Sequence, residues 1–155
     1  MGFEGGPAMK AFFGTFVNKV DAKGRVSVPA PFRAVIQGRG LTSVAIHPSL
    51  FESCLEGAGF DRFENLEAQI ADSFGPSTRD DVAELIMAEL RELPLDGEGR
   101  IVLPDEFIAK ANLKDQATFI GQGRRFQMWE PAALATVMKA KLQRVTAALK
   151  PKDMS

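Results

Sequence analysis

The chain has 155 residues, a hydrophobic content of 45 % and one cysteine, which excludes a small fold held by intrachain disulfides and favours a reducing compartment. No apolar run approaches the roughly 20 residues that cross a bilayer, and no signal-peptide pattern precedes the first predicted strand. The net charge of −1 argues against a uniformly basic nucleic-acid binder, and we expect a cytoplasmic protein with one domain or two small lobes sharing a core.

The charges are distributed unevenly along the chain. Residues 1–40 carry six Lys and Arg against two Asp and Glu, residues 41–98 carry three against thirteen, and residues 99–155 carry ten against five. Because salt screens charges beyond about 8 Å, the local excess at a surface matters more than the total. A basic first segment can therefore still present a face that binds nucleic acid.

The first part of the chain is predicted to be rich in strands. Residues 1–10 are glycine-rich and show no period, so we expect a flexible tail. Residues 12–20 predict a strand that leads into a short polar turn, and residues 26–28 predict the returning strand. A short helix over residues 31–36 and a strand over residues 43–47 should follow.

The middle of the chain changes to a helical period. Residues 51–55 fit either a strand or a helix. Apolar residues then recur at intervals of three and four over residues 60–74 and again over residues 82–93, which predicts two amphipathic helices. The second is expected to have Thr78 as its N-cap and to end at Pro94, and this insert carries the acidic excess.

After the insert, the pattern of the first part returns. We expect a helix over residues 104–111, strands over residues 117–121 and 126–129, and a C-terminal helix that Pro131 begins. That last helix has an apolar stripe formed by Leu134, Val137, Met138, Leu142, Val145 and Leu149.

An internal duplication organises the chain. The stretch from Val20 to Arg33 reads VDAKGRVSVPAPFR, and 75 positions later the stretch from Leu95 to Ile108 reads LDGEGRIVLPDEFI. Asp, Gly, Arg, Pro and Phe coincide without a gap, which is far better agreement than chance would give.

Each copy contains a turn whose Asp and Gly residues suit a tight loop. Asp21 and Asp96 stand at the turn entrance, where a carboxylate can accept backbone N–H groups across the loop. Gly24 and Gly99 can take a positive φ at little steric cost. We therefore expect these four residues to support the two loops.

Basic residues gather around the first turn. Lys23 and Arg25 flank its glycine, and basic side chains on a projecting hairpin can clamp phosphates or enter a groove, where Arg can bond a guanine edge. The alternative is that Arg25 folds back onto Asp21 and only orders the loop, and that Lys23 is a solvated charge. Ordering the loop and binding DNA are compatible roles for Arg25.

The second copy departs from the first in charge. Glu98 occupies the position of Lys23 and would repel phosphate, and Ile108 occupies the position of Arg33. We therefore expect the first copy to make most of the DNA contact and the second to contribute less, through Arg100.

The pattern Asp-x-Lys-Gly-Arg-x-x-x-Pro followed by a Phe-Arg helix resembles the SpoVT-AbrB family of DNA-binding domains. Two copies, with Phe13-Gly14 ahead of the first and Phe-Gln-Met-Trp-Glu ending the second, resemble the MraZ family of bacterial transcriptional regulators. This resemblance implies an α+β fold in which two pseudo-symmetric repeats form one duplicated swapped-hairpin, AbrB-like β-barrel with added helices. The expected parts are a tail (1–10), a first repeat (15–57), a helical insert (58–89), a second repeat (90–133) and a C-terminal helix and tail (134–155).

The resemblance also implies a function. It implies a sequence-specific regulator that binds tandem short direct repeats on double-stranded DNA upstream of the division and cell-wall gene cluster, including its own promoter. It further implies a homo-oligomeric ring of about eight or more subunits in the cytoplasm, associated with the nucleoid and not with a membrane. The residues expected to contact DNA are Lys19, Lys23, Arg25, Arg33 and Arg100. The alternative is an antitoxin-like module that binds a partner protein.

Other chemistry has little support in the sequence. His47 and Cys54 are the only residues of their types, and neither has a second ligand or an orienting partner in an established pattern, so we expect no metal, no cofactor and no enzymatic activity. The segment over residues 121–125 lacks the Lys-Ser/Thr of a phosphate loop, which favours a hairpin turn. Trp129 is expected in the core.

Overall fold

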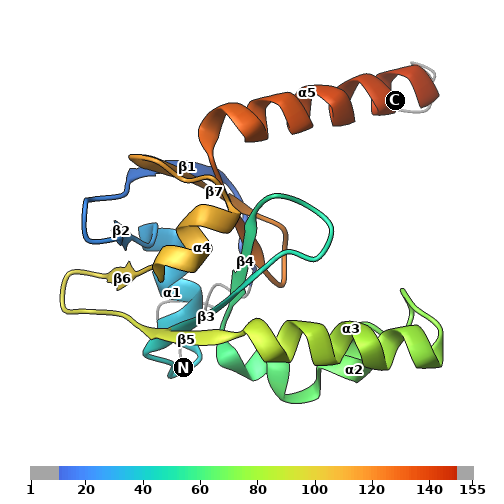
Figure 1. Ribbon diagram of the computed structural model, residues 1–155, viewed down its shortest axis with the longest axis horizontal. Helices are drawn as coiled ribbons and strands as arrows, with labels where there is room; N and C mark the ends of the chain where they lie inside the picture. Colours follow the sequence, from blue (N-terminus) through green and yellow to red (C-terminus); the bar gives the residue numbers. More distant parts are fainter. Residues whose placement is uncertain (1–10, 150–155) are drawn as a thin grey trace, which may run out of the picture.

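The computed structural model describes residues 11–149, so the predicted tail over residues 1–10 and the last residues, 150–155, lie outside the described part. The fold is α+β, as predicted, with an antiparallel sheet and several helices (Figure 1). The first half contains β1 (Thr15–Lys19), β2 (Arg25–Ser27), α1 (Ala30–Gly38), β3 (Ser43–Pro48) and β4 (Leu55–Ala58). The insert contains the 3₁₀ helix η1 (Phe60–Asn65), α2 (Leu66–Gln69) and α3 (Pro76–Glu89). The second half contains β5 (Arg91–Pro94), β6 (Arg100–Val102), α4 (Asp105–Lys110), β7 (Gln116–Gly121), β8 (Phe126–Trp129) and α5 (Pro131–Ala148).

Strands of the two halves share one six-stranded sheet with the order β1-β7-β8-β4-β3-β5. Each strand of the first half has a counterpart in the second half, β1 with β5, β3 with β7 and β4 with β8. When the counterparts are exchanged, the same order results, read from the opposite edge of the sheet. β1 pairs with β7 and β4 with β8, so the sheet is held together by ladders that join the halves.

The expected closed barrel is not formed by the described residues. β1 and β5 are the two edges of the six-stranded sheet and do not pair with each other. The chain leaves each edge strand through a turn and enters β2 or β6, and these two strands form a separate two-stranded sheet. The six-stranded sheet therefore stays open at both of its edges.

The two-stranded sheet lies where the two copies of the repeated stretch meet. Val26 pairs with Ile101 at its centre. On either side the backbone N–H of Val28 donates to the carbonyl of Gly99 at 3.0 Å, and that of Leu103 donates to the carbonyl of Gly24 at 2.9 Å. Each copy therefore supplies the backbone partners of the other.

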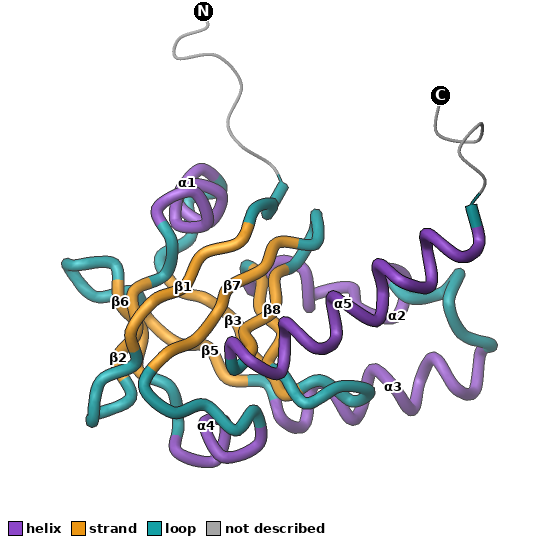
Figure 2. The backbone as a smooth tube through the Cα atoms, turned by 90° about the horizontal axis from the view of Figure 1, so that it is seen from above, coloured by secondary structure: helices purple, strands orange, loops and turns teal. Residues whose placement is uncertain are grey.

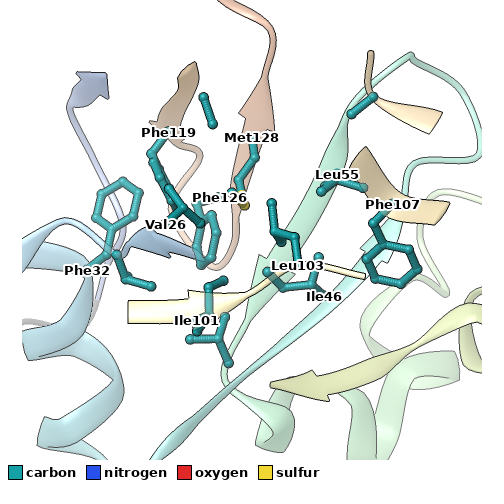
Figure 3. Close-up of a cluster of buried hydrophobic side chains, with 14 of the residues drawn as sticks. Val26, Phe32, Ile46, Leu55, Ile101, Leu103, Phe107, Phe119, Phe126 and Met128 are labelled. Atoms are coloured by element: carbon teal, nitrogen blue, oxygen red, sulfur yellow. The ribbon is translucent and has the colours of Figure 1, made fainter. Parts of the chain in front are cut away.

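The main core lies between the sheet and the helices α1 and α4, and it is rich in phenylalanine (Figure 3). Phe32 on α1 is fully buried, with its ring centroid 5.3 Å from those of Phe12 and Phe126 and 5.5 Å from that of Phe16. Its counterpart Phe107 on α4 is also fully buried. Trp129 is buried, as predicted, in a smaller cluster beneath α5.

The insert differs from its prediction in three ways. A single helix over residues 60–74 is wrong, because Asn65 leaves the helical conformation between η1 and α2 (φ −141°, ψ 52°). Thr78 is not the N-cap of α3, since the helix begins at Pro76, after Gly75. The helical period also does not continue to Leu93, because residues 91–94 pair with β3 as a strand.

The C-terminal helix packs on the sheet only by its first turns. Leu134 is buried beside Trp129, but farther along the stripe Met138, Leu142 and Val145 are exposed, Leu142 by 64 %. Figure 1 shows α5 projecting away from the body of the molecule. The predicted apolar stripe thus has no cover along most of its length within the described chain.

Replacing Phe32 with Ala should lower the free energy of unfolding by about 3–5 kcal/mol, because a fully buried aromatic ring leaves a cavity among other rings. Chemical denaturation measures the change. The matched control is Phe13→Ala, whose side chain is 64 % exposed and which should change stability by no more than about 0.5 kcal/mol. Equal losses in the two variants would contradict this packing.

Candidate nucleic-acid interface

The two repeated turns lie on the same side of the molecule. Figures 1 and 2 both show the β1–β2 turn and the β5–β6 turn on the side away from the free end of α5. They emerge from opposite ends of the β2–β6 ladder, whose antiparallel register pairs Ser27 with Arg100 and Arg25 with Val102. One flank of the protein therefore carries both hairpin tips.

The first turn is closed by hydrogen bonds around Asp21. The N–H of Gly24 donates to the carbonyl of Asp21 at 3.0 Å. The Oδ1 atom of Asp21 accepts the backbone N–H groups of Lys23 and Arg25, each at 2.9 Å, and Oδ2 accepts the Nε of Arg25 at 2.6 Å. One carboxylate thus orders both the loop and the arginine side chain.

The second turn repeats this arrangement. Asp96 accepts the backbone N–H groups of Glu98 at 2.8 Å and Arg100 at 2.9 Å, and it also accepts the Nε of Arg100 at 2.9 Å. The difference is that the Nη2 of Arg100 also donates to Glu98, at 3.1 Å. Two carboxylates therefore engage Arg100, whereas among the described residues only Asp21 engages Arg25.

These contacts shift ionisation in the expected directions. The backbone N–H of Arg25 and then its guanidinium lower the pKa of Asp21, and the backbone N–H of Arg100 lowers the pKa of Asp96. The bond to Asp96 raises the pKa of Arg100. Both carboxylates are ionised at neutral pH and hold their arginines in fixed orientations.

Glycine is required in both turns for two reasons. The φ angles of Gly24 and Gly99 are +79° and +77°, in the left-handed region. A Cβ on Gly24 would lie 2.8 Å from the carbonyl oxygen of Leu103, and one on Gly99 would lie 2.6 Å from the Cδ of Arg33. Each glycine thus allows the opposite repeat to approach closely.

The position of Arg33 could not be predicted from the residues near it in the sequence. It packs over Gly99 of the second turn, and its Nη1 donates to the carbonyl of Val28. Its counterpart Ile108 lies against Gly24 in the same way. Sequence reasoning missed this contact because it joins residues of different repeats. The alignment of Arg33 with Ile108 would have been the only signal.

The remaining predicted cations lie on the first hairpin. Lys19 is exposed at the end of β1, and Lys23 is exposed at the tip of the turn. Within the described residues, no carboxylate lies within ion-pair distance of either amine. Asn18, which the sequence did not single out, donates from Nδ2 to the carbonyl of Ser27 at 2.7 Å and joins the two arms of this hairpin. The structure therefore gathers Lys19, Lys23 and Arg25 on one ordered element.

The other residues considered from the sequence lie elsewhere. His47 is buried, its Nδ1 lies 2.9 Å from the carbonyl oxygen of Pro48, and burial lowers its pKa. Burial raises the pKa of the Cys54 thiol to about 12. Residues 121–125 form the turn between β7 and β8, as predicted. Among residues 11–149 no three His, Cys, Asp or Glu side chains are grouped to hold a metal ion.

No helix in the described part of the chain is long and apolar enough to cross a membrane.

Comparisons with known proteins point to one family. Residues 86–147 match the model of the family described as "MraZ protein", an antitoxin-like family. A protein named transcriptional regulator MraZ from Rhodospirillum rubrum is 43 % identical over 137 residues, covering 86 % of this chain and 88 % of the relative. Proteins of the same name from Pelagibacter ubique (44 % identity, 79 % of each chain) and Xanthobacter autotrophicus (38 % identity, 88 % of each chain) are also similar.

The glycines of the turns should differ in their tolerance of a side chain. Gly24→Ala should lose more than about 2 kcal/mol of stability, because the left-handed φ alone costs about 1–2 kcal/mol and a backbone carbonyl blocks the Cβ. Gly99→Ala should lose only about 1–2 kcal/mol, since the Arg33 side chain can move.

The matched control for this comparison is Gly97→Ala, in the same turn as Gly99. A Cβ there meets nothing within 4 Å and its φ is not positive, so stability should change by no more than about 0.5 kcal/mol. Chemical denaturation of the three variants measures the order of their losses in stability. A Gly97→Ala loss as large as that of Gly24→Ala would contradict the geometry described above.

Proposed function

The chain belongs to the MraZ family, and from this premise we propose that it is a sequence-specific DNA-binding transcriptional regulator. The observation that carries the proposal is an ordered, projecting hairpin with Lys19, Lys23 and Arg25 on one flank of the molecule. The relatives carry the name transcriptional regulator, which agrees with such a surface.

In this proposal the basic residues of the first hairpin make different contacts with DNA. Lys23 and Lys19 neutralise phosphates, because their amines are exposed and unpaired within the described chain. Arg25, held by Asp21 at one nitrogen, reaches into the groove with its remaining donors in a fixed orientation. Pre-ordering by Asp21 and Gly24 lowers the entropy lost on binding.

The second hairpin contributes less in this proposal. Glu98 stands at its tip and also binds Arg100, so the field near the phosphates is weaker there. Arg33 acts mainly by supporting this turn, since it packs over Gly99 and binds the carbonyl of Val28. Asp96 and Gly99 keep the turn geometry that the β2–β6 ladder needs.

We also propose that the fold is the duplicated swapped-hairpin arrangement of the AbrB type, with repeats over residues 15–57 and 90–133. Two observations support this: the strand order stays the same when the two halves are exchanged, and β2 pairs with β6 across the repeats. The target in this proposal is a set of tandem direct repeats upstream of the division and cell-wall genes, including its own promoter, which would place the protein at the nucleoid.

Several copies of the chain are needed to bind several tandem repeats at once. Two exposed apolar surfaces, on α5 and α3, could join these copies. α5 exposes an apolar stripe with Lys139, Lys141 and Arg144 beside it. α3 lies on the opposite side of the molecule in Figure 1 and exposes Leu85 by 55 %, with Asp81 and Glu84 nearby. Two different, complementary surfaces on one chain favour a head-to-tail contact, which closes into a ring when the rotation allows.

DNA binding should depend on the first tip more than on the second. Lys23→Ala should weaken binding to a duplex with the direct repeats from its own promoter by about fivefold or more per assembly, because each subunit loses a phosphate contact. Arg100→Ala should have a smaller effect. Electrophoretic mobility shift or fluorescence anisotropy over a salt series measures both.

The matched control is Arg124→Ala, exposed in the turn between β7 and β8, which should leave the DNA affinity and its salt slope unchanged. Loss of affinity in Arg124→Ala with none in Lys23→Ala would contradict the assignment of the interface. A folded protein that binds no duplex but captures a partner protein would favour the antitoxin-like alternative.

The assembly should depend on the two exposed apolar surfaces. Leu142→Asp on α5 and Leu85→Asp on α3 should each reduce the molar mass measured by light scattering, because a buried unpaired carboxylate opposes the contact. Gln143→Asp, which is exposed beside the stripe on α5, should leave the mass unchanged. An unchanged mass in both leucine variants would exclude these surfaces.

A further inference from the structure

A cavity of about 200 Å³ lies between the sheet and the helical insert. Its floor is formed by β3, β4, the loop between them and the turn before β8, and its roof by η1, α2 and α3. The apolar walls include Leu66, Ile70 and Ile86 of the insert. Neither of the two hairpin turns contributes a residue, so the cavity is separate from the proposed DNA interface.

One end of the cavity is polar and strongly charged. Glu56 has its Oε1 3.8 Å from the Nε2 of His47 and 3.7 Å from the Nε of Arg125, and its Oε2 accepts the Nε2 of Gln127 at 3.1 Å. Three neighbouring side chains therefore share this single carboxylate. Burial lowers the pKa of His47, which favours the neutral imidazole.

Arg62 lines the same end and makes no direct ion pair with a described residue there. Its Nη1 donates to the amide oxygen of Gln69 at 3.0 Å, and within residues 11–149 no carboxylate oxygen lies within 4 Å of its guanidinium. Burial and then the nearby Arg125 lower the pKa of Arg62, the Glu56 carboxylate opposes this shift, and Arg124 adds to it. A half-buried guanidinium that makes no direct ion pair carries a desolvation cost that a bound anion would offset.

The surroundings increase this positive potential. A second hollow shares Arg62 and is lined also by Arg39, Arg124 and Asp61. Arg39 lies 3.7 Å from Asp61 and forms an ion pair with it. Four arginines and two carboxylates thus border the two hollows.

We infer that this cavity binds a small amphipathic anion, with its carboxylate or phosphate head between Arg62 and Arg125 and a short alkyl chain along Leu66 and Ile70. Guanidinium groups bind either head through paired, charge-assisted hydrogen bonds. A mostly apolar cavity with a few convergent polar groups is the usual form of a small-ligand site. The volume, below the roughly 300–1,000 Å³ of drug-sized sites, restricts the ligand to a short chain.

Isothermal titration calorimetry on the full chain tests this inference with hexanoate, hexyl phosphate and 1-hexanol as probes. We expect saturable binding of one anion per chain and binding of the alcohol weaker by at least about tenfold. Whichever of hexanoate and hexyl phosphate binds more tightly identifies the head group. Arg62→Gln and Arg125→Gln should each weaken binding of that anion by at least about tenfold.

Two controls make the result decisive. Arg125 is 41 % exposed, so Arg125→Gln should fold normally even if Arg62→Gln does not, and a thermal melt checks both. Arg144→Gln, on exposed α5, should bind the anion as the unmodified chain does. The inference is overturned by the absence of saturable binding for both anions, by equal affinity for 1-hexanol, or by unchanged affinity in a folded Arg125→Gln variant.

Discussion

The ladder between β2 and β6 is the contact on which the rest of the structure depends. Val26 and Ile101, each 1 % exposed, pair at its centre, and the adjoining backbone bonds run from each repeat into the turn of the other. A hairpin with a three-residue returning strand is marginal alone, because it buries too little apolar surface to offset its conformational entropy. The two halves therefore complete each other, and the six-stranded sheet continues the same exchange.

This ladder explains why one turn geometry occurs twice with two different tips. The carboxylate, the left-handed glycine and the arginine of each turn are needed to hold the ladder, so both copies keep them. The tip residue donates only its backbone N–H to the aspartate in both turns, so its side chain is free to differ. In the proposed function, Lys23 therefore suits the first tip to phosphate, whereas Glu98 makes the second tip less suited to it.

The sequence predicted the local features well because they arise from short-range patterns. The duplication, the two turns and most strands follow from residue spacing and from Asp and Gly chemistry. The errors came from contacts between distant segments. Residues 91–94 continue a helical pattern but form β5 because β3 supplies a ladder. The contact of Arg33 with Gly99 of the other repeat was not predicted either, while its role in DNA binding stays a prediction. Neither partner can be identified from the neighbouring sequence.

The most direct test of the central claim, that the first hairpin is the surface that meets DNA, is lysine acetylation footprinting of the assembled protein. Mass spectrometry with and without the operator duplex compares lysines within one molecule. The account predicts that DNA protects Lys19 and Lys23, whereas Lys139 and Lys141 on α5 react at the same rate in both states. Protection of the α5 lysines without protection of Lys19 and Lys23 would contradict it.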